Sequence, residues 1–194
     1  MTSFQKRIVL KPEVTPSDFE LVAWEKDWNL ADMGREDAGA SIDTWITDDT
    51  ESEIHFVDDQ PIGLAYLTLH GKATDTIEQQ IRGSLEAWTL AEAMEALRDA
   101  HDSEDRTKSL FTVVLIAPAD EDDAVTAQLA PLATDPDQAI RQSFIEATGY
   151  LPWPSLVALV EAMAANDSEQ AVRENAQLLL EGLEVTGEGP GRAT

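Results

Sequence analysis

The sequence predicts a mainly α-helical chain: a short α-solenoid of about three helical pairs, with an N-terminal helix and β-hairpin as its cap. Three observations lead to this prediction. Similar helix-start motifs recur at a nearly constant interval in the second half, a β-rich stretch lies between residues 53 and 70, and the last ten residues are rich in glycine. We therefore expect an N-terminal α+β segment (1–83), helical repeats (84–184) and a flexible tail (185–194).

The first segments of the chain predict one helix and one loop. Ser17 and Glu20 form a capping-box pattern, which predicts a helix over residues 17–30. Residues 31–41 contain two glycines and mixed charges, which is typical of a loop. Further on, Ile77 and Ile81 begin an apolar series at four-residue spacing, which predicts a helix over residues 74–85.

A β-hairpin is expected between these helices, over residues 53–70. Two β-rich runs flank a polar, proline-containing turn centred on Asp59 and Gln60. With that turn, residue 55 pairs near residue 64, so His55 and His70 are not expected to lie opposite each other. An isolated hairpin is marginally stable, and we expect the helix over residues 17–30 or the strand-like residues 7–10 to cover it.

Two matched motifs define the repeat in the second half of the chain. Asp135-Pro-Asp-Gln-Ala-Ile-Arg141 and Asp167-Ser-Glu-Gln-Ala-Val-Arg173 lie 32 residues apart, and apolar residues at helical spacing follow each. An aspartate followed three places later by glutamine is typical of a capped helix start, and Pro136 suits the first helical turn. Each motif therefore predicts a helix that begins at its aspartate.

A third, weaker copy begins 33 residues earlier, at Asp102, and ends at Lys108. The run that follows, residues 110–116, is rich in β-branched residues and on its own resembles a buried strand. Its register with the other copies predicts a helix instead. Three further amphipathic segments precede the three motifs and complete the helical pairs, over residues 84–100, 123–133 and 154–165.

With an aspartate at each turn and an arginine at the start of each second helix, residues 84–183 resemble the HEAT family of α-solenoids. The resemblance covers about half of the chain and implies a binding surface rather than a chemistry. It also implies a ladder of aspartates and arginines between neighbouring repeats, formed by Asp135, Arg141, Asp167 and Arg173, with Asp102 and Lys108 in the weaker copy.

Composition restricts the classes of function. The chain has 38 acidic and 13 basic residues, with a formal net charge of −25. Nucleic-acid phosphates and anionic membranes require a basic surface, so direct binding to either is not expected. The absence of cysteine excludes thiolate metal sites, and the absence of a signal-peptide core or membrane span favours the cytoplasm. The acidity itself indicates either adaptation to salt or attraction to a basic partner.

No motif in the sequence predicts catalysis, a metal site or a cofactor. The chain has no glycine-rich phosphate loop, no G-x-S-x-G and no H-E-x-x-H. Some HEAT-like proteins are DNA glycosylases, but the expected second helices carry more glutamates than arginines, which disfavours that reading.

Several residues are candidates for contact with a protein partner. The run from Asp120 through Glu121 and Asp122 to Asp123 is either a solvated helix start or a docking patch, and it lacks the glycine and distal glutamate of a calcium loop. Trp153 lies between two prolines, where exposure would let it anchor a contact. Glu146 and Glu174, on the expected second helices, complete the set.

These observations predict a non-catalytic acidic module that binds another, basic protein. Its most specific form is an inhibitor, such as an immunity protein that occludes a toxin. Two alternatives remain open: an adaptor or assembly subunit of a larger complex, and a DNA mimic that blocks a nucleic-acid-binding protein.

Overall fold

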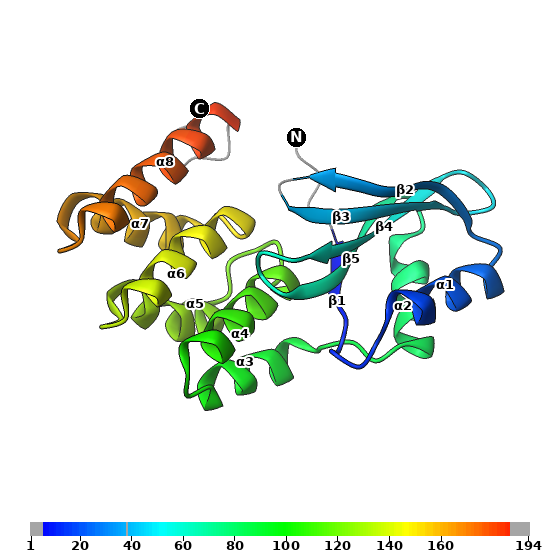
Figure 1. Ribbon diagram of the computed structural model, residues 1–194, viewed down its shortest axis with the longest axis horizontal. Coiled ribbons are helices and arrows are strands. Elements are labelled where there is room, and N and C mark those ends of the chain that lie inside the picture. Colours follow the sequence, from blue (N-terminus) through cyan, green and yellow to red (C-terminus); the bar gives the residue numbers. More distant parts are fainter. Residues whose placement is uncertain (1–5, 38, 187–194) are drawn as a thin grey trace. The chain divides into compact units, whose positions relative to one another are not determined.

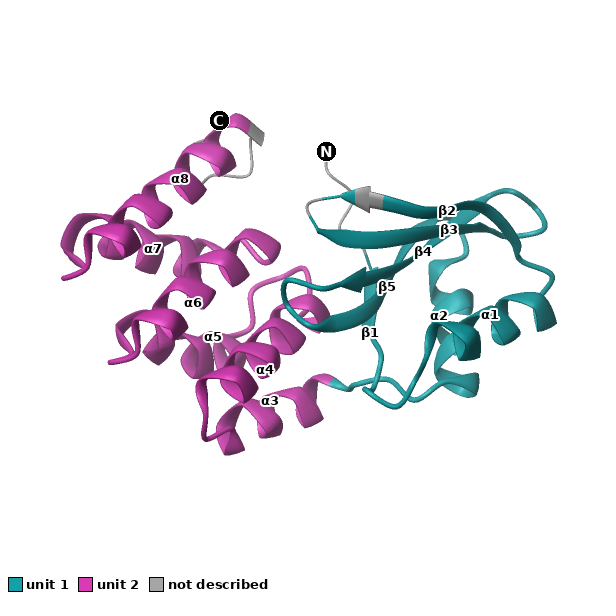
Figure 2. Ribbon diagram, viewed as in Figure 1, with its two compact units in different colours: residues 1–89 teal, residues 90–194 magenta. Residues whose placement is uncertain are grey.

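The computed structural model describes residues 6–37 and 39–186 and divides into two compact units, residues 1–89 and 90–194 (Figure 2). The first unit contains a five-stranded antiparallel sheet with helices, and the second is built from helices (Figure 1). The chain is therefore α+β. The predicted mainly α-helical solenoid with a hairpin cap is wrong as a fold class, because the expected hairpin is part of a full sheet.

The sheet has the strand order β1-β5-β4-β3-β2, and all neighbouring strands are antiparallel. Strand β1 pairs with β5 at one edge, so the strand-like start of the chain extends the expected hairpin. The strands are β1 (Lys6–Val9), β2 (Asn29–Asp37), β3 (Ala40–Ile46), β4 (Ser52–Asp59) and β5 (Leu64–Gly71).

One face of the sheet packs against helices α1 (Pro16–Glu25) and α2 (Thr74–Ser84). At the centre of this core, the ring of Phe19 lies edge-on to Trp45, with ring centroids 5.8 Å apart, and 5.4 Å from Phe56. Alternate residues of β4 and β5 supply the aliphatic part of the core, as expected for strands with one face turned inward. The helix predicted over residues 74–85 is confirmed as α2.

The loop predicted over residues 31–41 is wrong, because most of this segment belongs to β2 and β3. Strand β2 lies at the edge of the sheet, has two register shifts against β3, and contains Gly34 at a positive φ of 66°. Its exposed side chains give no alternating apolar pattern, so the sequence carried no strand signal. Helix α1 also starts earlier than expected: its capping box joins Thr15 and Asp18, not Ser17 and Glu20.

The helix predicted over residues 84–100 is shorter than expected and begins at Leu90. The preceding residues are extended, and the Trp88 N–H donates to the carbonyl of Val9 at 2.9 Å. Leu10 and Ala87 form an isolated β-bridge in the same place. Pairing with the N-terminal strand therefore takes up residues that the amphipathic pattern assigned to a helix.

The second unit consists of three successive helical pairs. Helices α3 and α4 form the first, α5 with a short 3₁₀ segment and α6 form the second, and α7 and α8 form the third. The second helices also pack on one another, α4 on α6 and α6 on α8. The bounds are α3 (Leu90–Asp99), α4 (Ser103–Ile116), α5 (Asp123–Leu129), η1 (Ala130–Thr134), α6 (Gln138–Tyr150), α7 (Pro154–Asn166) and α8 (Gln170–Thr186).

The strand-like run at residues 110–116 lies in α4, so the helix predicted from its register is confirmed. Residues 110–115 are all buried, which explains why this helix is apolar around its circumference. Helix α8 continues to Thr186, two residues into the expected tail, and the rest of that tail lies outside the described residues. No helix in the described part of the chain is long and apolar enough to cross a membrane.

Helices α6 and α8 begin later than the motifs predicted. The N-cap of α6 is Asp137, whose carboxylate accepts from the Ala139 N–H at 2.9 Å, and not Asp135. Asp167 likewise lies at the end of α7, and α8 begins three residues after it. Asp102 does cap α4, accepting from the Asp105 N–H at 2.8 Å. The carboxylates of Asp135 and Asp167 accept instead from the N–H groups two residues later, those of Asp137 and Glu169, each at 2.9 Å.

Candidate functional site

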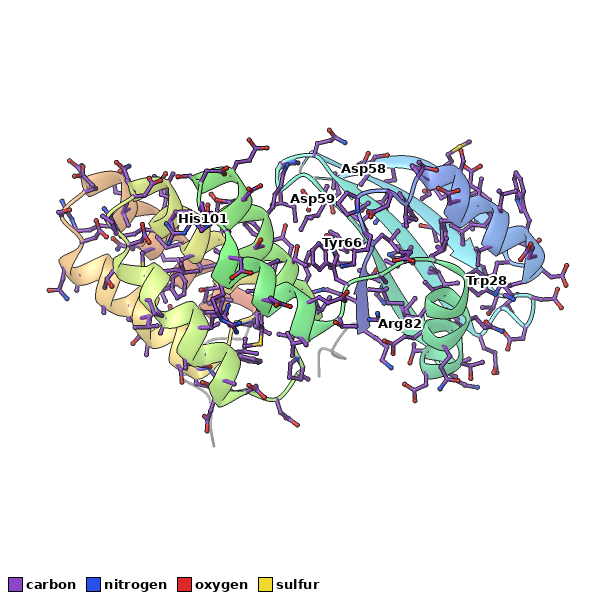
Figure 3. The ribbon with its side chains drawn as sticks, turned by 90° about the horizontal axis from the view of Figure 1, so that it is seen from below. Trp28, Asp58, Asp59, Tyr66, Arg82 and His101 are labelled. Atoms are coloured by element: carbon purple, nitrogen blue, oxygen red, sulfur yellow. The ribbon has the colours of Figure 1, made fainter. Side chains whose placement is uncertain are left out.

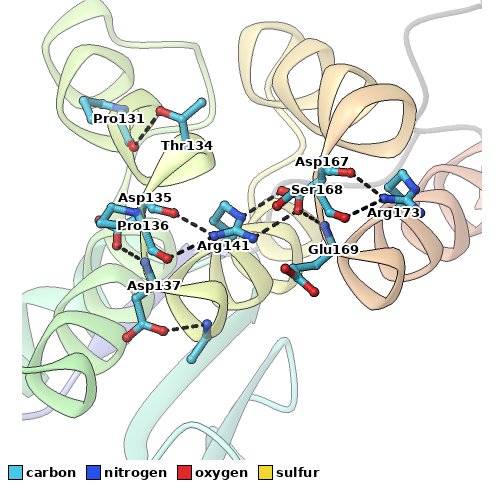
Figure 4. A network of polar contacts seen from close by, with 11 residues as sticks. Pro131, Thr134, Asp135, Pro136, Asp137, Arg141, Asp167, Ser168, Glu169 and Arg173 are labelled. Atoms are coloured by element: carbon cyan, nitrogen blue, oxygen red, sulfur yellow. Dashed lines mark hydrogen bonds and ion pairs between the residues drawn. The ribbon is translucent and has the colours of Figure 1, made fainter.

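Asp135 and Asp167 take part in an arginine–aspartate ladder along the turns of the helical pairs (Figure 4). Arg141 forms a two-point contact with Asp167: Nε lies 2.8 Å from Oδ2 and Nη2 lies 3.1 Å from Oδ1. Its Nη1 donates to the carbonyl of Asp135 at 2.8 Å and to that of Pro136 at 3.4 Å. Arg141 therefore ties its own turn to the turn of the next pair.

The preceding step of the ladder is formed by Arg106, which binds the carboxylate of Asp135. Lys108, the expected member, instead pairs with Glu104 on its own helix at 2.9 Å. The helix starts explain the difference: the N-cap Asp102 corresponds to the N-cap Asp137, so the counterpart of Arg141 is Arg106. This 35-residue correspondence was present in the sequence, but the 33-residue spacing between aspartates obscured it.

The ladder ends at Arg173. Its Nη1 donates to the carbonyls of Asp167 at 2.5 Å and Ser168 at 3.1 Å, the same two backbone positions that Arg141 contacts in its own turn. Within residues 6–37 and 39–186, no carboxylate forms an ion pair with Arg173. Arg173 thus makes the hydrogen bonds within its own turn but lacks the ion pair that would join it to a following turn.

The ladder pairs are charged and partly or fully enclosed. The hydrogen bonds from Arg141 lower the pKa of Asp167 and the bond from Arg106 lowers the pKa of Asp135. Hydrogen bonding to Asp167 raises the pKa of Arg141 in turn. Both partners of the Arg141–Asp167 pair are nearly buried, and the paired hydrogen bonds compensate for the lost hydration. The role of these residues is to fix the turns, not to present charge.

The acidic run after α4 has two roles. Asp122 caps α5, since its Oδ1 accepts from the N–H groups of Ala124 at 2.9 Å and Val125 at 3.0 Å. Asp120, Glu121 and Asp123 are exposed around it. The run is therefore a helix start that also holds three carboxylates in water, in a loop that the cap fixes in place.

Trp153 does not match the exposed anchor that its flanking prolines suggested. Its side chain is buried, with 4% of its surface exposed, and the indole N–H donates to the carbonyl of Ala119 at 3.2 Å. This bond joins the loop before α7 to the loop that precedes the acidic run. Trp153 can therefore position that run but cannot itself contact a partner.

Glu146 on α6 and Glu174 on α8 are both exposed. Partial burial raises the pKa of Glu146. Glu174 accepts a hydrogen bond from Gln170 at 2.6 Å, one turn earlier on the same helix. Neither carboxylate forms an ion pair within the described part of the chain.

The hairpin pairs differently from the sequence prediction and brings two histidines together. The turn is centred two residues further on than expected, so His55 pairs with Thr68, and Glu53 pairs with His70. The two imidazoles are diagonal neighbours on one sheet face, with ring centroids 4.6 Å apart. At the turn end of these strands, the hydroxyl of Tyr66 lies 3.5 Å from the carboxylate of Asp59 (Figure 3).

The histidine pair lacks the further ligands of a metal centre among the described residues. Among the described residues, no group of three or more histidine, cysteine, aspartate or glutamate side chains is placed to hold a metal ion. Burial and the neighbouring His55 lower the pKa of His70, whereas Glu53 opposes that shift. The arrangement favours a neutral His70.

Comparisons with protein-family models, with curated proteins and with solved structures find no match to this chain. The resemblance of residues 84–183 to HEAT repeats is therefore neither supported nor opposed by a relative. The geometry of the helical unit and the charge of the chain are the features that bear on function.

Proposed function

We propose that this chain is a non-catalytic, cytoplasmic binding module whose HEAT-like helical unit holds a basic protein. The observation that carries the proposal is the exposed group of Asp120, Glu121 and Asp123, at the junction of a loop with α5 that the Asp122 cap and the Trp153 bond to Ala119 hold in place. With 38 acidic and 13 basic residues, ion pairing within the chain leaves most carboxylates without a cation.

Rigidity of the helical unit supports this proposal. The ladder fixes the turns within the pairs, and the Trp153–Ala119 bond fixes loops between the pairs. When a partner binds such a surface, little conformational entropy of the module is lost, because its turns and loops are already ordered. Preorganisation of this kind raises affinity without additional contacts.

The charge supports an inhibitor as the specific form of the module. A field of one sign accelerates capture of an oppositely charged protein and makes the association rate sensitive to salt. An immunity protein has to bind a basic toxin before the toxin acts, so a high association rate favours its function. An adaptor subunit has less need of it.

The test is affinity capture from native lysate of the source cells at low ionic strength, with the full chain as bait. We expect one basic protein in stoichiometric amount, released by salt. A bait with Asp120→Asn, Glu121→Gln and Asp123→Asn should lose it, while Asp122 is kept because it caps α5.

The matched control also removes three negative charges, but from exposed positions of the first unit. It carries Glu13→Gln, Glu25→Gln and Asp48→Asn. This control should retain the partner. The proposal is wrong if no stoichiometric basic protein is recovered, or if both baits lose it equally, since the loss would then reflect total charge rather than this loop.

A further inference from the structure

The helical unit contains a pocket with a basic lining, which is unusual in a protein of this charge. The pocket has a volume of about 400 Å³ and lies beside the turn between α3 and α4. Its polar wall includes Arg98, His101, Arg106 and Gln128, and Leu97 and Leu132 form apolar parts. No carboxylate belongs to this lining, although the chain has 38 acidic residues.

The pocket lies beside Arg106, whose contacts differ from those of the other two arginines of the ladder. Arg141 and Arg173 each direct Nη1 to the carbonyls six and five residues earlier, and these bonds tie the arginine to its own turn. For Arg106 the corresponding residues are Ala100 and His101. The contact that the structure gives Arg106 is its bond to Asp135, and none joins it to those two carbonyls.

Ala100, His101 and Arg106 all line the pocket. The equivalent position in the next pair is a pocket of about 370 Å³ whose lining contains the Arg141–Asp167 ion pair. The first pocket has no such internal pair across it. Part of the Arg106 guanidinium therefore faces a cavity instead of its turn.

Two further donors face the same cavity. Arg98, near the end of α3, and His101, which follows it (Figure 3), are exposed and form no hydrogen bond or ion pair with the described residues. The Gln128 side chain is fixed by a 2.5 Å hydrogen bond to the carbonyl of Met94. Arg98, His101 and Arg106 thus line one pocket, from the end of α3, the turn after it and α4.

We infer that this pocket binds a small oxyanion of the phosphate class. Guanidinium groups donate paired hydrogen bonds to phosphate oxygens, and donors from several directions suit a tetrahedral anion better than a planar carboxylate. The net charge of −25 repels anions at long range, so binding depends on these short-range donors. The inference is independent of the basic partner proposed above.

The test uses the full chain and inorganic phosphate as the probe. We would titrate phosphate at constant ionic strength and follow the Nε–H resonances of Arg98 and Arg106 by NMR. Saturable shifts with a dissociation constant of about 1 mM are expected. Acetate at the same concentrations should bind at least about tenfold more weakly, because it offers two oxygens in one plane.

Arg98→Gln should weaken phosphate binding about tenfold, as expected for loss of a charge-assisted contact of roughly 1.4 kcal/mol. Lys108→Gln is the matched control: it removes one positive charge from the same helical pair but does not line the pocket, so it should leave binding unchanged. Arg106 is left intact because the ladder needs it. Equal effects of the two variants, equal binding of acetate and phosphate, or no saturable phosphate shift would each overturn the inference.

Discussion

Arg141 and Arg173 are equivalent residues with different partners, and this difference gives the first prediction. Arg141 is paired with a nearly buried Asp167, whereas Arg173 contacts backbone carbonyls. Arg141→Gln leaves a buried carboxylate unpaired and should lower the free energy of unfolding by about 3 kcal/mol. Arg173→Gln should lower the free energy of unfolding by about 1 kcal/mol or less. Urea denaturation followed by circular dichroism measures both, and equal losses would contradict the ladder as described.

His70 gives a prediction about pH. Burial and His55 lower the pKa of His70, so the unfolded chain takes up a proton at a higher pH than the folded protein does. The free energy of unfolding should therefore fall as pH decreases through the usual histidine range near ~6.5, and stop falling below the folded pKa. His70→Gln should flatten this part of the profile. An unchanged pH slope in the variant would show that His70 does not titrate differently on folding.

At the level of residues, the sequence identified the right positions but assigned some of them the wrong role. Asp135 and Asp167 pair with arginines, the role that the HEAT resemblance implies, but the helix start predicted at Asp135 lies at Asp137. Trp153 was singled out as exposed, but its indole packs between loops that only the fold brings together. Burial and ion pairing depend on residues about 30 positions away, and local patterns do not contain that information.

At the level of elements, prediction succeeded where periodicity was strong. The register with the other copies predicts helix α4, although residues 110–116 have a strand propensity. Residues 110–115 are all buried, so an apolar, β-branched sequence is compatible with a helix at this position. Strand β2 was missed because an exposed, bulged edge strand has no apolar alternation. Helix α3 was extended too far because β1 pairs with residues before it, a contact that no local pattern shows.

The end of β5 gives a prediction for an element. Gly71 has a φ of 102°, and a Cβ added there would lie 2.2 Å from the carbonyl oxygen of Glu51. Gly71→Ala should therefore destabilise the protein by more than about 2 kcal/mol. The matched control is Gly83→Ala in α2, where nothing lies within 4 Å, and it should be neutral or stabilising by up to about 1 kcal/mol. Thermal denaturation of the two variants compares them, and a stable Gly71→Ala protein would contradict this turn geometry.

At the level of the whole molecule, the sequence overstated the helical repeat because the repeat carries the clearest pattern. The first unit combines five strands and two helices around one aromatic core, and β1 joins the sheet through a long-range pairing with β5. Net charge, by contrast, is fixed by the sequence alone. Its distribution over exposed loops and helices is what the structure adds.

The net charge of −25 predicts how stability responds to salt. Repulsion among carboxylates opposes the folded state, and salt screens it, so raising NaCl from ~0.02 M to ~0.5 M should raise the unfolding midpoint. The Arg141–Asp167 pair is nearly buried and should be little affected by screening. A midpoint that falls with salt would show that exposed ion pairs outweigh the repulsion.

The central claim is that exposed carboxylates of the helical unit capture a basic protein. Its most direct test is the association rate of the captured partner across a salt series, measured for the wild type and for the Asp120→Asn, Glu121→Gln, Asp123→Asn variant. We predict a wild-type rate that falls steeply with salt, and a variant with a slower rate and a shallower slope. An association rate independent of salt, or the same slope in both proteins, would contradict the claim.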